Sequence, residues 1–314
     1  MTAILLDALV PIFAVLALGY FAGWIRDIDN HHVAELNALV MDFALPAALF
    51  VATASTPWAM LKAQWPLLLV LTASTLLLLA LAYWMQRRLF SLSTDAASIQ
   101  ALTIAQPNYG AAGLPLIAAV FDASHLIYVA LTLAFTSIFV SPLVLAVLEA
   151  SRSPQDKSAD SIVVLRAIAR SLLKPIVLSP IIGIMLAFFG LTPPDFVVHS
   201  FDLIGQAGGG IALFLTGLIL SSQHVILNAN VISGTLLKNV AHPFLAAGMV
   251  ALLPMPQDAA RAAILLAALP SGFFGVLFGL RYGVESRDAG STLIVSSVLS
   301  AATLAVALTI TGRS

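Results

Sequence analysis

Ten long stretches of this chain contain no Asp, Glu, Lys or Arg, and each is at least 18 residues long. They run over 8–25, 43–61, 63–86, 96–121, 123–148, 175–194, 203–237, 239–257, 262–280 and 289–312. A helix of about 20 apolar residues crosses the ~30 Å hydrocarbon core of a bilayer. Only 9% of the 314 residues are charged and 60% are hydrophobic, so charges cannot cover the surface of a soluble fold. The sequence predicts an all-α polytopic membrane protein.

We expect ten membrane-spanning helices in this chain. Their approximate bounds are 4–24, 33–54, 64–86, 97–121, 125–148, 166–190, 198–221, 230–253, 259–281 and 287–311. The longest polar stretch, EASRSPQDKSADS at 149–161, lies in the middle of the chain. We therefore predict a first five-helix repeat over 1–148, a short loop over 149–165 and a second five-helix repeat over 166–314.

The two halves resemble each other at three places that occur in the same order. VPIFAVLAL matches SPIIGIMLA, PAALFVATA matches GIALFLTGL, and AQPNYGAAG matches ALPSGFFGV. The matched positions lie 169, 164 and 163 residues apart, as one duplication with small insertions or deletions would leave them. Because five spans is an odd number, the second copy must be inverted in the membrane, which is the plan of many secondary transporters.

Basic residues indicate the orientation of the bundle. Loops on the N-terminal side hold three Lys or Arg residues, and loops on the opposite side hold ten. Loops rich in Lys and Arg stay in the cytoplasm. We therefore expect the 149–165 loop inside and both termini outside.

Proline and glycine interrupt the fourth and ninth spans at matching positions. The fourth contains Gln106, Pro107, Asn108, Tyr109 and Gly110, and the ninth contains Pro270, Ser271 and Gly272. Proline removes an amide donor and glycine destabilises a helix, so both helices are expected to break there, ~16 Å and ~13 Å into the membrane. Irregular backbone at this depth requires a polar cavity, and the second half-helices would direct N–H groups at an anion. The alternative is a pair of ordinary proline kinks.

Three of the ionisable residues inside predicted spans are candidates for a functional role. Lys238 and His242 are four residues apart and share one face of the eighth span. Lys238 could be a counter-charge for an anionic substrate or take part in proton coupling, or it could be a snorkelling lysine beside a core histidine. Asp42 in the second span could bind a proton or sodium, pair with Lys238, or form a structural ion pair.

Composition argues against several other classes of function. The net charge of −1 with scattered Lys and Arg gives no nucleic-acid footprint. The chain has no Cys, and the pair His31 and His32 lacks companions for a metal site. No nucleophile motif stands out, so we predict that the protein is not an enzyme and needs no metal or other cofactor. Coupling to H⁺ or Na⁺ stays open.

Several segments resemble the auxin efflux carrier family, which includes plant auxin exporters and many bacterial carriers. They are VPIFAVLALGYFAGW, ALPAALF, GIALFLTGLIL, LKNVAHPF and AALPSGFFGVLFGLRYG. The similarity extends from Val10 to about Leu308, and LPSGFFGVLFGLRYG followed by STLIVSS is most like the bacterial malonate-transporter subgroup. Plant members have a long loop between the halves, and this chain has only a short one, so regulation by loop phosphorylation has no support here.

The resemblance implies a fold and a mechanism. It implies two inverted repeats whose broken fourth and ninth helices cross, with Pro107 and Pro270 at the crossing and Asn108 and Ser271 beside them. It also implies scaffold helices (1, 2, 6 and 7), transport helices (3–5 and 8–10), and a homodimer that works by an elevator-like movement in the bacterial inner membrane.

The expected function is secondary active transport of a small organic anion, with a dicarboxylate such as malonate as the first candidate. Gln106, Pro107, Asn108, Tyr109, Lys238, His242, Pro270 and Ser271 are the predicted substrate-binding residues, and Asp42 is the predicted coupling residue. The alternatives are a carrier of an auxin-like monocarboxylate and a membrane sensor that binds its ligand without transport.

Overall fold

The computed structural model describes residues 2–28, 33–152, 169, 173–222, 225–284 and 286–312, and these residues are predominantly helical, with no strand among them. His31, His32, the start of the sixth predicted span and most of the 149–165 loop lie outside the described residues.

The helices begin and end close to the predicted span limits. In the first half they are α1 (Thr2–Trp24), α2 (Val33–Ala38), η2 (Leu39–Ala44), α3 (Leu45–Ala54), α4 (Trp58–Ala63), α5 (Trp65–Arg88), α6 (Thr94–Ala105), η3 (Tyr109–Gly113), α7 (Leu114–Val120), η4 (Ala123–His125) and α8 (Leu126–Arg152). In the second half they are α10 (Pro175–Phe188), α11 (Asp195–Ser221), α12 (Ala229–Leu236), η5 (Leu237–Ala241), α13 (His242–Leu252), α14 (Gln257–Ala267), α15 (Phe274–Arg281) and α16 (Arg287–Thr311). The short helix α4 was not predicted.

The surfaces of these helices suit a hydrocarbon environment. Among the described residues, five helices are long and apolar enough to cross a membrane: Val33–Ala54, Trp65–Arg88, Asp195–Ser221, Ala229–Leu252 and Arg287–Thr311. Large apolar side chains such as Phe244 (72% exposed) and Val298 (72% exposed) face outward in the middle of helices. Exposure of so much apolar surface to water is unfavourable in free energy, whereas its exposure to lipid is not. The chain is therefore an integral membrane protein.

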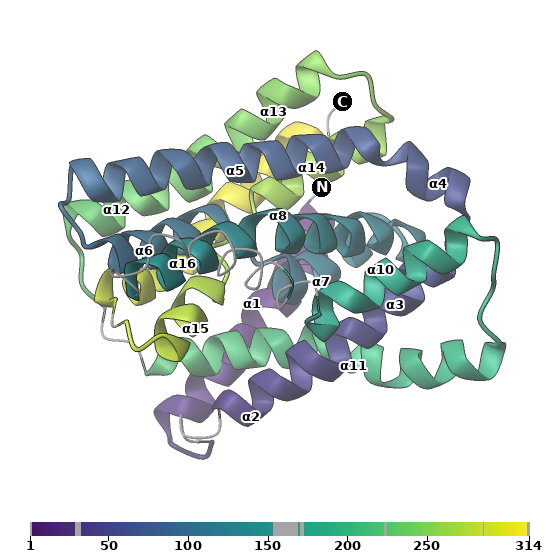
Figure 1. The fold of residues 1–314 in the computed structure, drawn as a ribbon, viewed down its shortest axis with the longest axis horizontal. Helices are drawn as coiled ribbons and strands as arrows, with labels where there is room; N and C mark the ends of the chain where they lie inside the picture. The colour runs from purple at the N-terminus through teal and green to yellow at the C-terminus, as the bar shows by residue number, and fades with distance from the viewer. Residues whose placement is uncertain are drawn as a thin grey trace.

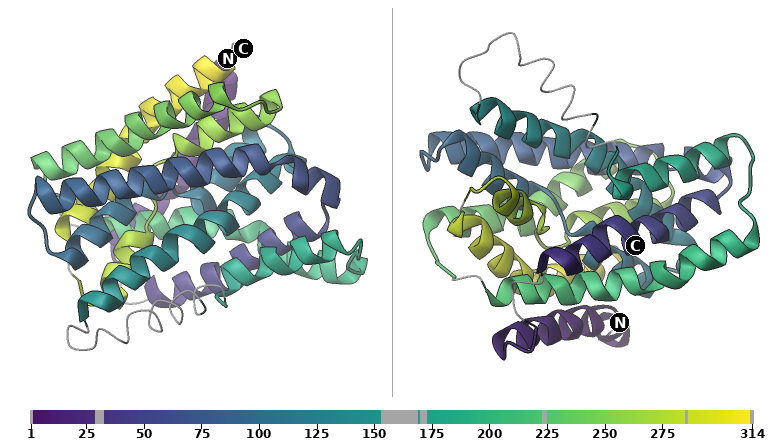
Figure 2. Two further views of the ribbon diagram at one scale, coloured as in Figure 1. Left: turned by 45° about the horizontal axis from the view of Figure 1, so that its top comes forward. Right: turned by 60° about the horizontal axis from the view of Figure 1, so that its bottom comes forward.

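The helices pack in two groups (Figures 1 and 2). In one group α1 packs along α11, and α3 packs against both α10 and α11. In the other group α5 packs against α6 and α8, α12 against α16, and α15 against α6. Helices from both halves of the chain contribute to each group, so neither half forms a separate domain.

Glycines allow the closest helix contact of the first group. A side-chain carbon on Gly19 of α1 would lie 2.0 Å from the Phe214 carbonyl oxygen, and one on Gly217 of α11 would lie 1.9 Å from the Leu16 carbonyl oxygen. Small residues let helix backbones approach closely in a membrane. An Ala at either position would push α1 and α11 apart.

Within the described residues there are three turns of π-helix, and each includes a predicted site residue. The turn η2 contains Asp42, η3 begins at Tyr109, and η5 contains Lys238. A π turn is rare and occurs mostly at functional sites, because the extra residue changes which side chains face a neighbouring helix.

Candidate functional site

The two predicted breaks meet in the centre of the second helix group. The segment between α6 and η3 runs antiparallel to the segment between α14 and α15, and Pro107 lies opposite Ser271. The Asn108 N–H donates to the Pro270 carbonyl oxygen (2.9 Å), and the Gly272 N–H donates to the Gln106 carbonyl oxygen (2.7 Å). These two bonds satisfy backbone groups that the broken helices leave without partners. We call this contact the crossover.

Asn108 begins the second half of the fourth predicted span. Its side-chain Oδ1 accepts a hydrogen bond from the Ala111 N–H (3.2 Å), so Asn108 is the N-cap of η3. Capping fixes the orientation of the amide, since the oxygen must face Ala111. The amide nitrogen has no hydrogen-bond partner within the described residues, and it remains available as a donor.

Gln106 presents an acceptor. The Thr136 hydroxyl donates to the Thr132 carbonyl oxygen (2.8 Å), so its oxygen can only accept from Gln106 Nε2, which lies 3.4 Å away. This assignment leaves Gln106 Oε1 buried and without a hydrogen-bond partner in the described structure. Gln106 directly precedes Pro107, and the hydrogen bond from its Nε2 to Thr136 connects it to α8.

Ser271 presents a hydroxyl group. Most buried Ser and Thr side chains in these helices donate to a carbonyl three or four residues earlier, as Thr103 does to Ile99 (2.9 Å). Ser271 follows Pro270 in extended backbone, and its hydroxyl is fully buried with no partner in the described structure. A buried polar group without a partner is costly, which marks a place where a ligand or water can bind.

Tyr109 lies beside the crossover but its side chain points into the protein core. The ring is fully buried, and its hydroxyl lies 3.4 Å from the Thr75 hydroxyl on α5. Its position favours a role in packing α5 against η3. The sequence pattern placed Tyr109 with the binding residues because it follows Asn108 directly.

Lys238 binds the end of the helix that leads into the second break. It is fully buried, and its Nζ donates to the carbonyl oxygen of Ala267 (2.7 Å), the last residue of α14. A cation is favourable there because the C-terminus of a helix carries partial negative charge. A backbone carbonyl oxygen therefore stabilises the Lys238 ammonium group. The sequence had suggested the carboxylate of Asp42 as one possible partner.

A chain of hydrogen bonds continues from Lys238 to α5. Lys238 Nζ lies 3.2 Å from His242 Nδ1, and His242 Nε2 lies 3.2 Å from the Ser74 hydroxyl. Ser74 donates its own proton to the Leu71 carbonyl oxygen (3.2 Å). With Ser74 as a donor to Leu71, the tautomer of His242 that donates from Nε2 and accepts at Nδ1 from Lys238 fits all three contacts. These contacts hold η5 and α13 against α5.

Asp42 lies apart from these residues. It sits in η2 with an exposed side chain, and η2 packs against α10 and α11. The contacts of Lys238 are to Ala267 and His242, so the structure does not bring Asp42 and Lys238 together.

A cavity of about 600 Å³ lies between α3 and α11 of the first group and α7 and the start of α8. Its walls come from α3, α11, α7 and the start of α8, and they include Gly205, Gly209 and Gly210 of α11. The cavity extends to Leu114 and Pro115, which begin α7 directly after η3. It is wide enough for a small metabolite.

Comparison with known proteins covers nearly the whole chain. A family model described as "Membrane transport protein" matches residues 4–308. The chain belongs to this family. The finding confirms the resemblance to auxin efflux carriers, so the protein is a membrane transporter.

Three relatives of the transporter illustrate the range of the family. It is 28% identical to "Uncharacterized transporter YfdV" of Escherichia coli (strain K12) over 92% of this chain and 91% of that protein. It is 26% identical to "Putative malonate transporter" of Rhizobium meliloti (strain 1021), over 94% and 92% of the two chains. It is 25% identical to "Auxin efflux carrier component 5" of Arabidopsis thaliana, over 94% and 93%.

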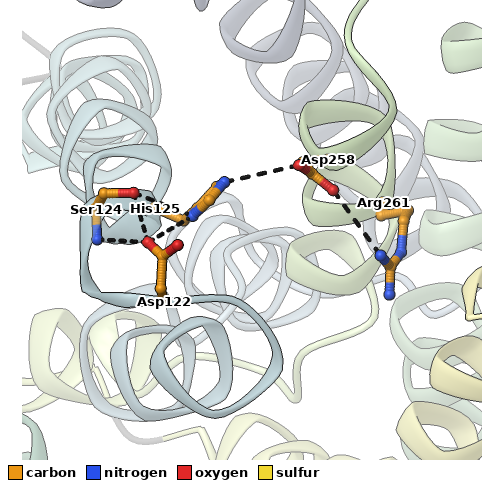
Figure 3. A network of polar contacts seen from close by, with 5 residues as sticks. All are labelled: Asp122, Ser124, His125, Asp258 and Arg261. Carbon is orange, nitrogen blue, oxygen red and sulfur yellow. Dashed lines mark hydrogen bonds and ion pairs between the residues drawn. The ribbon is translucent and has the colours of Figure 1, made fainter.

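A polar network connects the C-terminal end of α7 to the N-terminal end of α14, the ends of the two broken helices that lie away from the crossover (Figure 3). Asp122, after α7, accepts hydrogen bonds from the Ser124 backbone (2.8 Å) and from His125 Nδ1 (2.9 Å). On the other side of the ring, His125 Nε2 lies 3.8 Å from Asp258 of α14, which lies 3.8 Å from Arg261. Exposed ion pairs contribute little free energy, so the network mainly aligns the two ends.

Acid is expected to weaken this network through Asp122. Hydrogen bonds from Ser124 and then His125 lower the pKa of Asp122 from 3.8 to about 2. Because the folded pKa lies below the unfolded value, the carboxylate stabilises the fold above pH 3.8, and this contribution disappears as pH falls through about 2. Asp122→Asn should therefore lower the melting temperature at pH 5, with a deficit that shrinks toward pH 2. A pH-independent deficit would contradict this assignment.

Proposed function

We propose that this transporter is a secondary carrier of a small organic anion, with a dicarboxylate such as malonate as its substrate, and that the crossover is the binding site. The crossover carries the proposal because it gathers an amide donor on Asn108, a hydroxyl on Ser271 and the starts of two half-helices. N–H groups and positive dipole ends at such starts favour a carboxylate. The malonate name of the Rhizobium meliloti relative supports this choice of substrate.

We also propose that the fold is a ten-helix inverted repeat that moves as an elevator. The described helices begin and end near the limits of the ten predicted spans, and both breaks occur at matched positions of the two halves. The grouping of α1, α3, α10 and α11 fits a scaffold, and the group that contains the crossover fits a moving transport unit. The cavity between the groups would lead substrate toward the crossover.

Counterflow in proteoliposomes tests this function. Vesicles that contain the purified transporter and unlabelled malonate should accumulate labelled malonate, and vesicles without the transporter should not. Competition by succinate but not by acetate would support recognition of two carboxylates. Competition by the auxin indole-3-acetate alone would favour the monocarboxylate alternative, and no accumulation of malonate would reject the proposed substrate.

Three further properties are proposed with this function. Coupling to H⁺ or Na⁺ would use Asp42, whose side chain on η2 is exposed. The transporter would act as a homodimer, as the family resemblance implies. Lipid would cover the exposed apolar side chains, and no nucleic-acid partner is expected.

Orientation in the inner membrane is a separate prediction. The excess of Lys and Arg on one side predicts that the 149–165 loop lies in the cytoplasm and both termini lie outside. The chain has no Cys, so a single cysteine can report its own location. A Ser158→Cys variant should resist a membrane-impermeant maleimide in intact cells and react after permeabilisation. Labelling in intact cells would reverse the orientation.

A further inference from the structure

We propose that Asn239 and Ser296 are positioning residues of the crossover. They lie on neighbouring helices and fix the backbone of the second break. Their link to the break rests on hydrogen bonds within the protein. Their link to substrate rests on the proposed function of the crossover.

Three buried hydrogen bonds carry this proposal. The backbone N–H of Ser271 donates to the Ser296 hydroxyl oxygen on α16 (2.9 Å). That hydroxyl donates its single proton to Asn239 Oδ1 on η5 (2.6 Å), and Asn239 Nδ2 donates to the Ser296 carbonyl oxygen (3.0 Å). The Asn239 oxygen accepts from the Ser296 hydroxyl and the Asn239 nitrogen donates to the Ser296 carbonyl oxygen, so these partners determine the orientation of the Asn239 amide. Ser271 and Ser296 are 0% exposed and Asn239 is 1% exposed.

The two breaks are stabilised in different ways. At the first break, Asn108 caps the Ala111 N–H from within the same segment. At the second break, Ser271 occupies the corresponding place, but its hydroxyl makes no such bond. Ser296 on a neighbouring helix instead accepts from the backbone N–H of Ser271. The corresponding N–H at the first break, that of Asn108, donates to the Pro270 carbonyl oxygen. The second break is therefore held through its backbone by another helix, and not by a side-chain cap within the segment.

The π turn η5 secures both sides of the second break. Its residue Lys238 binds the carbonyl oxygen of Ala267 before Pro270, and its next residue, Asn239, holds the Ser271 N–H through Ser296 after Pro270. Two consecutive residues thus fix the segment on either side of the proline. This arrangement leaves the Ser271 hydroxyl uncommitted at the crossover, where the proposed substrate would need it.

Loss of the Ser296 hydroxyl or the Asn239 amide should destabilise the backbone around Ser271. In Ser296→Ala the Ser271 N–H has no acceptor in apolar surroundings, and a buried donor without a partner destabilises the local structure. We expect amide hydrogen exchange over residues 269–275 to become roughly 10-fold faster, and the Kd for malonate to rise by a similar factor. Asn239→Ala should have the same effect, because it removes the group that orients the Ser296 hydroxyl.

The experiment compares hydrogen–deuterium exchange and malonate binding in the full-length purified transporter. Ser297→Ala is the matched control, because Ser297 is also buried on α16 but donates to Leu293 of its own helix (2.8 Å). Ser297→Ala should match the wild type, and Ser296→Thr, which keeps a hydroxyl, should restore slow exchange. If Ser296→Ala does not fold, Asn239→Ala provides the same comparison.

The outcomes separate this proposal from the proposed function. Unchanged exchange over 269–275 in Ser296→Ala, or faster exchange in every helix, would overturn the positioning role. Faster local exchange with an unchanged malonate Kd would overturn its link to the substrate site. If the wild type binds no malonate, the proposed substrate fails, and the exchange data still decide whether Asn239 and Ser296 support the break.

Discussion

Replacing Lys238 with Gln is expected to raise the Kd for malonate roughly 10- to 100-fold, which corresponds to the loss of one charge-assisted interaction of ~1.5–3 kcal/mol. The reason is electrostatic. Lys238 Nζ binds the carbonyl end of α14 just before the second break, and Lys238 is the only basic residue of η5. Gln keeps an amide donor on a side chain that is one atom shorter, so the substitution removes the charge and retains a donor on the same face of η5.

Binding of labelled malonate to purified Lys238→Gln measures this effect. The matched control is Lys62→Gln, since Lys62 is exposed on α4. The control should bind malonate as the wild type does. A wild-type Kd in well-folded Lys238→Gln would limit Lys238 to its structural contacts with Ala267 and His242.

The second large effect is expected at Asn108, which has two separable roles. Asn108→Ala removes the N-cap of η3, which should lower stability by ~1 kcal/mol, and it also removes the amide donor from the proposed site. Asn108→Asp keeps a capping oxygen but replaces the donor with a negative charge. Both variants should lose malonate binding by at least ~10-fold, and only Asn108→Ala should also lose the cap.

Thermal unfolding and malonate binding together distinguish these roles. Ser271→Ala is the comparison within the site, and it should weaken binding less than Asn108→Ala because it removes a smaller hydrogen-bonding group. Near wild-type affinity in monodisperse Asn108→Ala would place the substrate away from the crossover.

The breaks were predictable from sequence because proline and glycine act locally. Pro107 lacks an N–H wherever the chain folds, so the end of α6 at Ala105 follows from the sequence. The limits of the apolar helices follow in the same way from uncharged stretches. The family assignment was also within reach, since its motifs are continuous segments.

The contacts of individual side chains were not predictable in the same way. Nothing in the sequence near Lys238 indicates that its partner is the carbonyl oxygen of Ala267, which lies 29 residues away. The role of Ser296 depends on the distance between α16 and a break 25 residues earlier. The π turns escaped prediction because an extra residue in a helical turn leaves the apolar composition unchanged.

The prolines of the crossover also determine how the two breaks can move. A shift of either segment that made Pro107 or Pro270 the donor is impossible, because neither has an N–H. The pairing therefore cannot slide in that direction or grow into a longer ribbon, and it consists of the two bonds made by Asn108 and Gly272. Any movement of the transporter that keeps these bonds must carry both broken helices together as one unit.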